Sequence, residues 1–223
     1  MLGIPILLFP EYRNQISSEK FQKKLDLVES IIGFSKGKNL SRDAIDTISQ
    51  KLGTRMKGTT LYPGGSSCLF GWSFSFDKIG SVIIKPYYSR ELSALIIHYL
   101  TVQDYVDEFQ NMQFQLNDKK ILVKLPKVVG VAKIETFSRS YPVLMTTEAP
   151  GEAIQPYPSL IRQVGTFTRD LALKKGIISD PYPSNWKVTI TGSHGTIQYI
   201  DLLSSNRLKD VHLRISELIK GLE

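Results

Sequence analysis

The chain has 223 residues, of which 42% are hydrophobic and 22% are charged. This composition excludes a disordered chain and is typical of a soluble globular protein with a real core. A single cysteine, Cys68, excludes an internal disulfide, so we expect a cytoplasmic protein. The apolar run at 3–9 is too short to span a bilayer and predicts a buried strand, so we expect no association with membranes.

The net charge of +7 favours polyanionic partners, which could be nucleic acid, an acidic membrane surface or nucleotide phosphates. The basic residues are scattered along the chain in short pairs, which favours a generally basic surface over a dedicated nucleic-acid groove. A nucleic-acid role for the N-terminal part stays open, because the helix that ends at Gly53 weakly resembles part of a helix-turn-helix.

Two helices are predicted near the N-terminus. Apolar residues at helical spacing predict the first over 18–33, closed by Gly33. The second begins at Ser41, whose hydroxyl is placed to cap the free amides, and ends at Gly53. Together they form an N-terminal helical piece.

Strands begin after these helices. In 69–76 the large residues alternate with glycine and serine, which predicts a strand with one buried face, and 81–86 returns as its partner. Later elements follow the same periodicities. They are a helix from Ser89, strands near 120–124, 127–132 and 142–147, a helix over 158–174, two short strands, and a final helix with apolar residues from Leu208 to Leu218.

The segment between the first strands is rich in glycine and serine. Gly64, Gly65, Ser66 and Ser67 could bring backbone amides close to phosphate oxygens, although such a stretch is more often an ordinary turn. Lys85 ends the apolar strand that follows. Its ammonium either extends to the edge of the sheet or contacts nucleotide phosphates.

Two later segments carry candidate catalytic and metal-binding groups. Asp180 and Asn185 stand five residues apart in a loop stiffened by two prolines, where they either occupy turn positions or face a hydroxyl nucleophile and a metal. Asp201 ends a strand, and its carboxylate suits Mg²⁺. The three histidines match no zinc-binding spacing.

The order of glycine loop, strand lysine, helix glutamate, Asp-x-x-x-x-Asn loop and strand aspartate resembles the protein-kinase-like superfamily over about 60–205. The resemblance implies that Lys85 contacts the nonreacting phosphates of ATP, that Asp180 orients or deprotonates the acceptor, and that Asn185 and Asp201 bind Mg²⁺. Glu91 is implied as the partner of Lys85, with Asp104 or Glu108 as alternatives.

The stretch 143–151 resembles the hinge between the two kinase lobes, so backbone groups near Thr147, Glu148 and Ala149 are implied to bind adenine. The implied fold is α+β and bilobal, with an antiparallel-sheet N-lobe and a truncated, mostly helical C-lobe. The expected domains are a helical extension over 1–58, the N-lobe and hinge over 59–150, and a minimal C-lobe over 151–223.

The chain also departs from the usual kinase pattern. Ile178 stands in place of the catalytic-loop histidine, Tyr182 in place of a lysine, and Leu202–Leu203 in place of Phe-Gly. The loop from Asp180 to Asn185 is similar to that of aminoglycoside phosphotransferases, and the short tail is similar to RIO-type atypical kinases and small bacterial effector kinases.

These features predict a Mg-ATP-dependent phosphotransferase that acts on a hydroxyl, with a protein Ser or Thr as the expected acceptor. A protein substrate or partner is therefore expected. Two alternatives remain: a pseudokinase or nucleotide-binding module without transfer, and a small-molecule phosphotransferase.

Overall fold

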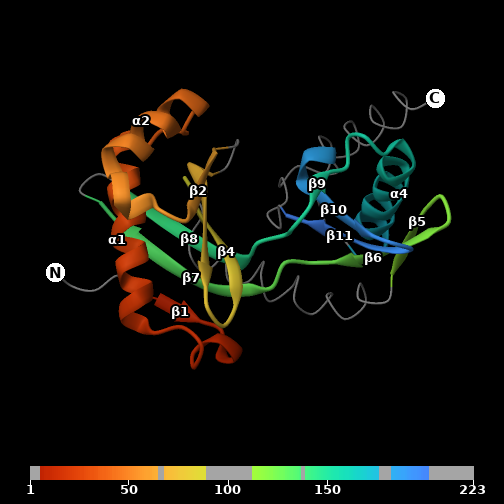
Figure 1. Ribbon diagram of the computed structural model, residues 1–223, viewed down its shortest axis with the longest axis horizontal. Helices are drawn as coiled ribbons and strands as arrows, with labels where there is room; N and C mark the ends of the chain where they lie inside the picture. The colour runs from red at the N-terminus through yellow and green to blue at the C-terminus, as the bar shows by residue number, and fades with distance from the viewer. Residues whose placement is uncertain (1–5, 65–67, 89–111, 137–138, 176–181, 201–223) are drawn as a thin grey trace. The chain divides into compact units, whose positions relative to one another are not determined.

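The computed structural model describes residues 6–64, 68–88, 112–136, 139–175 and 182–200. The chain forms two compact units, and each is assembled from two separate stretches of sequence. The first unit contains Met1–Ile97 and Lys127–Glu148, and the second contains His98–Pro126 and Ala149–Glu223. Each unit has its own β-sheet (Figure 1).

The sheet of the first unit has six strands in the order β1-β7-β8-β4-β3-β2, and every neighbouring pair is antiparallel. The strands are β1 (Ile6–Leu8), β2 (Thr59–Pro63), β3 (Phe70–Phe76), β4 (Gly80–Pro86), β7 (Val128–Glu135) and β8 (Ser140–Thr147). The strands expected near 69–76, 81–86, 127–132 and 142–147 are therefore confirmed. The apolar run near the N-terminus contributes the edge strand β1, although Leu7 within it is exposed.

The two predicted N-terminal helices are present as α1 (Ser18–Ser35) and α2 (Arg42–Leu52). The hydroxyl of Ser41 accepts a hydrogen bond from the amide of Ala44 at 3.3 Å, which confirms the predicted cap. The predicted end of the first helix at Gly33 was wrong. The helix continues to Ser35 and closes at Lys36, whose φ of 51° is left-handed.

Both helices pack on the same face of the six-stranded sheet. Phe21, Leu25 and Val28 of α1 are fully buried and belong to one apolar cluster with Trp72 and Ile84 of the sheet. The strand register places the other large apolar residues of the cluster on that side too, including Phe74, Val82, Val143 and Met145. We call this side the helix face. The unit is held together mainly by burial of these side chains.

The expectation that β3 is buried on one face alone was wrong. Gly71 and Ser73, on the face opposite the aromatic residues, are buried as well, and Ser73 is 6% exposed. Alternation of large and small residues identifies the two faces of a strand, but it does not show whether the second face is covered.

The second unit contains a five-stranded mixed sheet in the order β5-β6-β11-β10-β9. Its strands are β5 (Gln113–Leu116), β6 (Lys119–Lys124), β9 (Glu152–Ala153), β10 (Trp186–Thr191) and β11 (His194–Tyr199). The β6–β11 pair is parallel, and the other neighbours are antiparallel. Thus β5 and β6, which precede β7 in the sequence, belong to this second sheet.

One face of this sheet is covered by α4 (Pro158–Lys175), where a helix was predicted. Phe167 of α4 lies edge-on to Phe114 and to Trp186, with 6.0 Å between the ring centroids in each case. The side chain of Gln163 bonds the backbone amide and carbonyl of Gln115 at 2.7 Å each. Helix α4 thus covers the sheet and also satisfies backbone groups of the edge strand β5.

The α+β class holds, but the expected mostly helical C-lobe was wrong. In the described part of the second unit, five strands accompany one long helix and the short 3₁₀ turn η3 (Pro183–Asn185). The physical reason is the long-range parallel pairing of β6 with β11, which has no local sequence signal. The helices expected from Ser89 and from Leu208 lie outside the described residues. Across the ranges that are described, no helix has the length and apolar composition needed to cross a membrane.

Removal of a buried contact between α1 and the sheet should destabilise the first unit. We expect Leu25→Ala to lower its free energy of unfolding by about 2–5 kcal/mol, because Leu25 is fully buried and the space it leaves would not refill. The chain has two tryptophans, Trp72 in the first unit and Trp186 in the second. Urea unfolding followed by fluorescence in a Trp186→Phe background therefore reports on the first unit.

The matched control is Glu29→Ala, on the exposed side of the same helix. It should change the free energy of unfolding by less than about 0.5 kcal/mol. Equal effects of the two substitutions would contradict the packing of α1 on the sheet.

Candidate functional site

Lys85 lies on the face of the six-stranded sheet opposite the helices. Its neighbours in β4, Val82 and Ile84, are buried on the helix face, and Ile83 and Lys85 alternate with them. Lys85 pairs with Leu144 of β8. Ile83 pairs with both Ser73 and Thr146, so these side chains share the face of Lys85. We call this group of five residues the lysine face.

The lysine face lies at the centre of the sheet, since β4 is bonded to β3 on one side and β8 on the other. The Lys85 side chain is half-buried, while Ser73, Leu144 and Thr146 are buried. The central strand fixes the backbone of Lys85 and therefore the side of the sheet from which its side chain projects. This arrangement suits a charge that must meet an anionic group at a defined place.

Gly64 has a structural role in the loop before β3. A Cβ atom at Gly64 would lie 2.2 Å from the carbonyl oxygen of Leu69 and 2.7 Å from that of Cys68, so the position requires glycine. The amide of Gly64 donates to the carbonyl of Leu40 at 3.1 Å. This amide is therefore already bonded. Gly65, Ser66 and Ser67 lie outside the described residues.

The segment expected to contact adenine is tied into the sheet. The amide of Thr147 donates to the carbonyl of Lys127 at 2.8 Å, and the amide of Glu148 donates to that of Ser81 at 2.8 Å. Ala149 follows as the first residue of the second unit's later stretch. Of the three residues predicted to contact adenine, Thr147 and Glu148 therefore have backbone amides that are already hydrogen-bonded within the first unit.

The side chain of Glu148 is a feature that sequence reasoning missed. Its carboxylate accepts a hydrogen bond from the hydroxyl of Ser73 at 2.5 Å and one from that of Tyr62 at 2.8 Å. These bonds join the end of β8 to β2 and β3, across 86 and 75 residues of sequence. A serine between aromatic residues was the available signal, because a buried hydroxyl requires a partner.

This contact also changes the acidity of Tyr62. Burial, followed by the hydrogen bond to Glu148 and the charge of that carboxylate, raises the pKa of Tyr62 to about 12. Burial and the neighbouring Glu11 raise the pKa of Tyr12 to about 12 as well. Both phenols therefore stay protonated in the folded state well above the ordinary tyrosine pKa of 10.0.

In the second unit, Asn185 is held at the base of the β10–β11 hairpin. Its carbonyl accepts a hydrogen bond from the amide of Ile200 at 2.8 Å, and its own amide donates to the carbonyl of Tyr182 at 2.8 Å. The next pair in the ladder is Trp186 with Tyr199. Asn185 is thus fixed opposite the residue that immediately precedes Asp201 in the chain.

The other predicted catalytic and metal-binding residues cannot be placed. Asp180, Asp201, Glu91 and its alternatives Asp104 and Glu108 all lie outside the described residues. Within the part of the chain that is described, no three His, Cys, Asp or Glu side chains gather as metal ligands. The structure therefore brings Asn185 next to Ile200, the chain neighbour of Asp201, and puts Lys85 on the lysine face of the first unit's sheet.

The raised tyrosine pKa values predict a loss of stability at high pH. An unfolded tyrosine loses its proton near pH 10, whereas Tyr62 and Tyr12 keep theirs to about pH 12. The free energy of unfolding of the first unit should be independent of these groups below about pH 10 and fall as the pH rises from about 10 to 12. Urea unfolding followed by Trp72 fluorescence at a series of pH values measures this slope.

Tyr62→Phe should make that fall shallower, because only Tyr12 would remain to release a proton. Tyr182→Phe, an exposed tyrosine of the second unit, is the control and should leave the slope unchanged. An unchanged slope in Tyr62→Phe would show that burial and Glu148 do not perturb the pKa of Tyr62.

Comparison with known proteins gave no match, either to a family model or to a curated protein.

Proposed function

We propose that the chain is a Mg-ATP-dependent phosphotransferase that moves the γ-phosphate of ATP to a hydroxyl group, with a protein Ser or Thr as the acceptor. In this proposal Lys85 neutralises the nonreacting phosphates, Asn185 and Asp201 bind Mg²⁺, and Asp180 orients the acceptor hydroxyl. Each residue retains the role that the resemblance implies.

The observation that carries the proposal is the pairing of Asn185 with Ile200. Mg²⁺ is usually held by one or two protein oxygens together with phosphate oxygens and water, at nearly octahedral geometry. Two side chains distant in sequence can share such an ion only if the backbone holds their segments at a fixed register. The 2.8 Å bond from the Ile200 amide to the Asn185 carbonyl fixes that register as far as Ile200, the residue that precedes Asp201 in the sequence.

The position of Lys85 gives independent support. Lys85 lies on the lysine face, with Ser73 and Thr146 as well as the apolar Ile83 and Leu144, away from the helix face on which α1 packs. Gly71 lies on the same strand as Ser73, and a Cβ atom there would lie 3.1 Å from Ile83. The face thus places the cation of Lys85 on the same side of the sheet as the Thr146 hydroxyl, while the Ser73 hydroxyl is bonded to Glu148.

The reaction would proceed by in-line transfer. A bond forms between the acceptor oxygen and the γ-phosphorus, while the bond from that phosphorus to the oxygen bridging the β- and γ-phosphates breaks. The leaving group is ADP, and the hydroxyl proton passes to the carboxylate of Asp180 or to water. Lys85 and Mg²⁺ would stabilise charge on the phosphate oxygens, which is the main task in phosphoryl transfer.

The test is transfer of label from γ-labelled ATP with Mg²⁺ to the protein itself and to a mixture of Ser- and Thr-containing proteins. Lys85→Met keeps the length of the side chain and removes its charge, and it should lower the rate roughly 10²-fold. Asn185→Ala should act similarly and should raise the Mg²⁺ concentration needed for half-maximal rate. If both residues serve one reaction, the double variant should lose much less than the product of the two single effects.

Lys133→Met is the matched control, because Lys133 is also half-buried and lies on the same side of the sheet, in β7. It breaks an exposed ion pair with Glu135, which contributes little to stability, and should leave the rate within about twofold. Absence of any transfer by the folded wild-type protein would overturn the proposal. Binding of ATP without transfer would instead indicate a nucleotide-binding module, and transfer to sugars or aminoglycosides alone would indicate a small-molecule phosphotransferase.

A further inference from the structure

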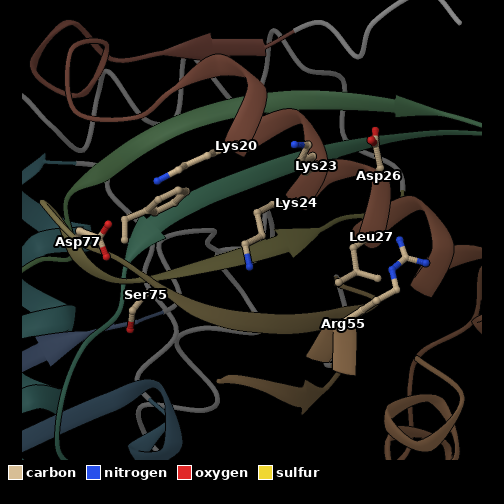
Figure 2. Close-up of a pocket in the computed structure, with 9 residues that line it drawn as sticks. Lys20, Lys23, Lys24, Asp26, Leu27, Arg55, Ser75 and Asp77 are labelled. Atoms are coloured by element: carbon tan, nitrogen blue, oxygen red, sulfur yellow. The ribbon is translucent and has the colours of Figure 1, made fainter. Parts of the chain in front are cut away.

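A basic hollow of about 550 Å³ lies on the first unit, beside α1 and the end of β3 (Figure 2). Lys20, Lys23, Lys24 and Leu27 line one side, and their spacing puts them on one stripe of the helix. The other side is lined by Arg55, from the short 3₁₀ helix η2 (Gly53–Met56), and by residues at the end of β3. The residues that line it are Lys20, Lys23, Lys24, Asp26, Leu27, Arg55, Ser75, Phe76 and Asp77. We call it the basic hollow.

Three of its four cations have no carboxylate partner among the described residues. Lys23 is paired with Glu19 at 2.7 Å, but Lys20, Lys24 and Arg55 form no ion pair there. Lys20 and Arg55 are exposed, and Lys24 is half-buried. Four cations and two carboxylates line the hollow, so its lining carries a net positive charge.

Lys24 differs from Lys20 and Arg55 because it is half-buried and lies over aromatic rings. Its ammonium lies 5.2 Å from the ring centroid of Trp72 and 4.7 Å from that of Phe74. Burial lowers its pKa. These cation–π contacts explain why a lysine is found at position 24, since its side chain covers the aromatic rings of the core. They do not account for Lys20, one turn away on the same stripe, or for Arg55 from η2. An anionic ligand would reduce the repulsion among these like charges.

The shape of the charged lining favours an extended ligand. Lys20 to Leu27 spans about 10 Å along the helix, which exceeds the size of one phosphate or carboxylate and matches about three residues of extended peptide. The half-buried ring of Phe76 and the buried side chain of Leu27 add an apolar part. Asp26 and Asp77 also line the hollow. Their carboxylates can accept hydrogen bonds from the backbone amides of a peptide, which a phosphate backbone lacks. They would repel any acidic group of the ligand placed next to them, so the ligand's acidic groups must lie at the cations.

We propose that the basic hollow is a docking site for an acidic, extended segment of a partner protein, with one apolar side chain beside Phe76 and carboxylates at Lys20, Lys24 and Arg55. This binding does not depend on the proposed phosphotransfer. A second copy of this chain is the wrong kind of occupant, since its net charge of +7 opposes the cations of the hollow.

The probe is a fluorescein-labelled synthetic peptide of alternating Glu and Ser with one central Leu, and its affinity is measured by fluorescence anisotropy near physiological salt. Lys20→Glu/Arg55→Glu should weaken binding about fivefold or more, because two attractions become repulsions. The matched control is Lys38→Glu/Lys57→Glu, two exposed lysines of the same unit outside the hollow. It changes the net charge equally and should weaken binding less than about twofold.

Two further measurements fix the site and the kind of ligand. In ¹⁵N-labelled protein, the acidic peptide should shift the amide signals of Ser75, Phe76 and Asp77, and a Gln-for-Glu version of the peptide should not. Should the charge-reversed variant fail to fold by circular dichroism, Lys20→Gln/Arg55→Gln tests the same charges with milder changes and should weaken binding about threefold.

Equal weakening in the two double variants would overturn the proposal, since it would reduce the effect to net charge. Failure of the wild-type protein to bind the acidic peptide would overturn it as well. Preferential binding of a labelled oligothymidylate, lost on Lys20→Glu/Arg55→Glu, would assign the hollow to nucleic acid instead.

Discussion

Burial of the aromatic and aliphatic side chains of the six-stranded sheet under α1 and α2 is the constraint on which the first unit depends. Side chains alternate along a strand. Because Trp72, Ile84 and Met145 are buried on the helix face, the residues next to them in each strand must project from the opposite face. Lys85 is therefore directed away from the helices by the same burial that stabilises the unit. A register shift of one residue would bury its charge in the apolar cluster, at a cost that the unit could not sustain.

Polar contacts on the opposite side depend on this arrangement. Ser73 lies opposite the helix face because Trp72 and Phe74 are buried within it, and its hydroxyl then requires an acceptor. Glu148 supplies that acceptor and also binds Tyr62. Substitution of Glu148 would leave the Ser73 hydroxyl buried without a partner, which costs more than loss of an exposed contact. The carboxylate is best understood as a positioning residue that joins the end of β8 to β2 and β3.

The sequence allowed correct prediction of several elements whose cause was local, although not of the end of α1. Helical spacing and the Ser41 cap located α1 and α2, and alternation located β3 and β4. It failed where the cause was a distant segment. The mixed sheet of the second unit depends on the parallel pairing of β6 with β11, more than 70 residues away, and only the fold reveals that pairing. The contact of Glu148 with Ser73 was missed for the same reason.

The roles assigned to the candidate site residues stay predictions. Residue types and their order suggested Lys85 and Asn185, and the structure gives each a definite backbone setting within its own unit. Periodicity gave no sign of the basic hollow, because its lysines lie on the flank of an ordinary amphipathic helix and its other side comes from η2 and β3. Helix α1 packs on the face of the sheet opposite Lys85. A partner held along α1 and a phosphate chain held at Lys85 would therefore approach opposite sides of one sheet, and Ser75 is the lining residue of the hollow that lies on the side of Lys85.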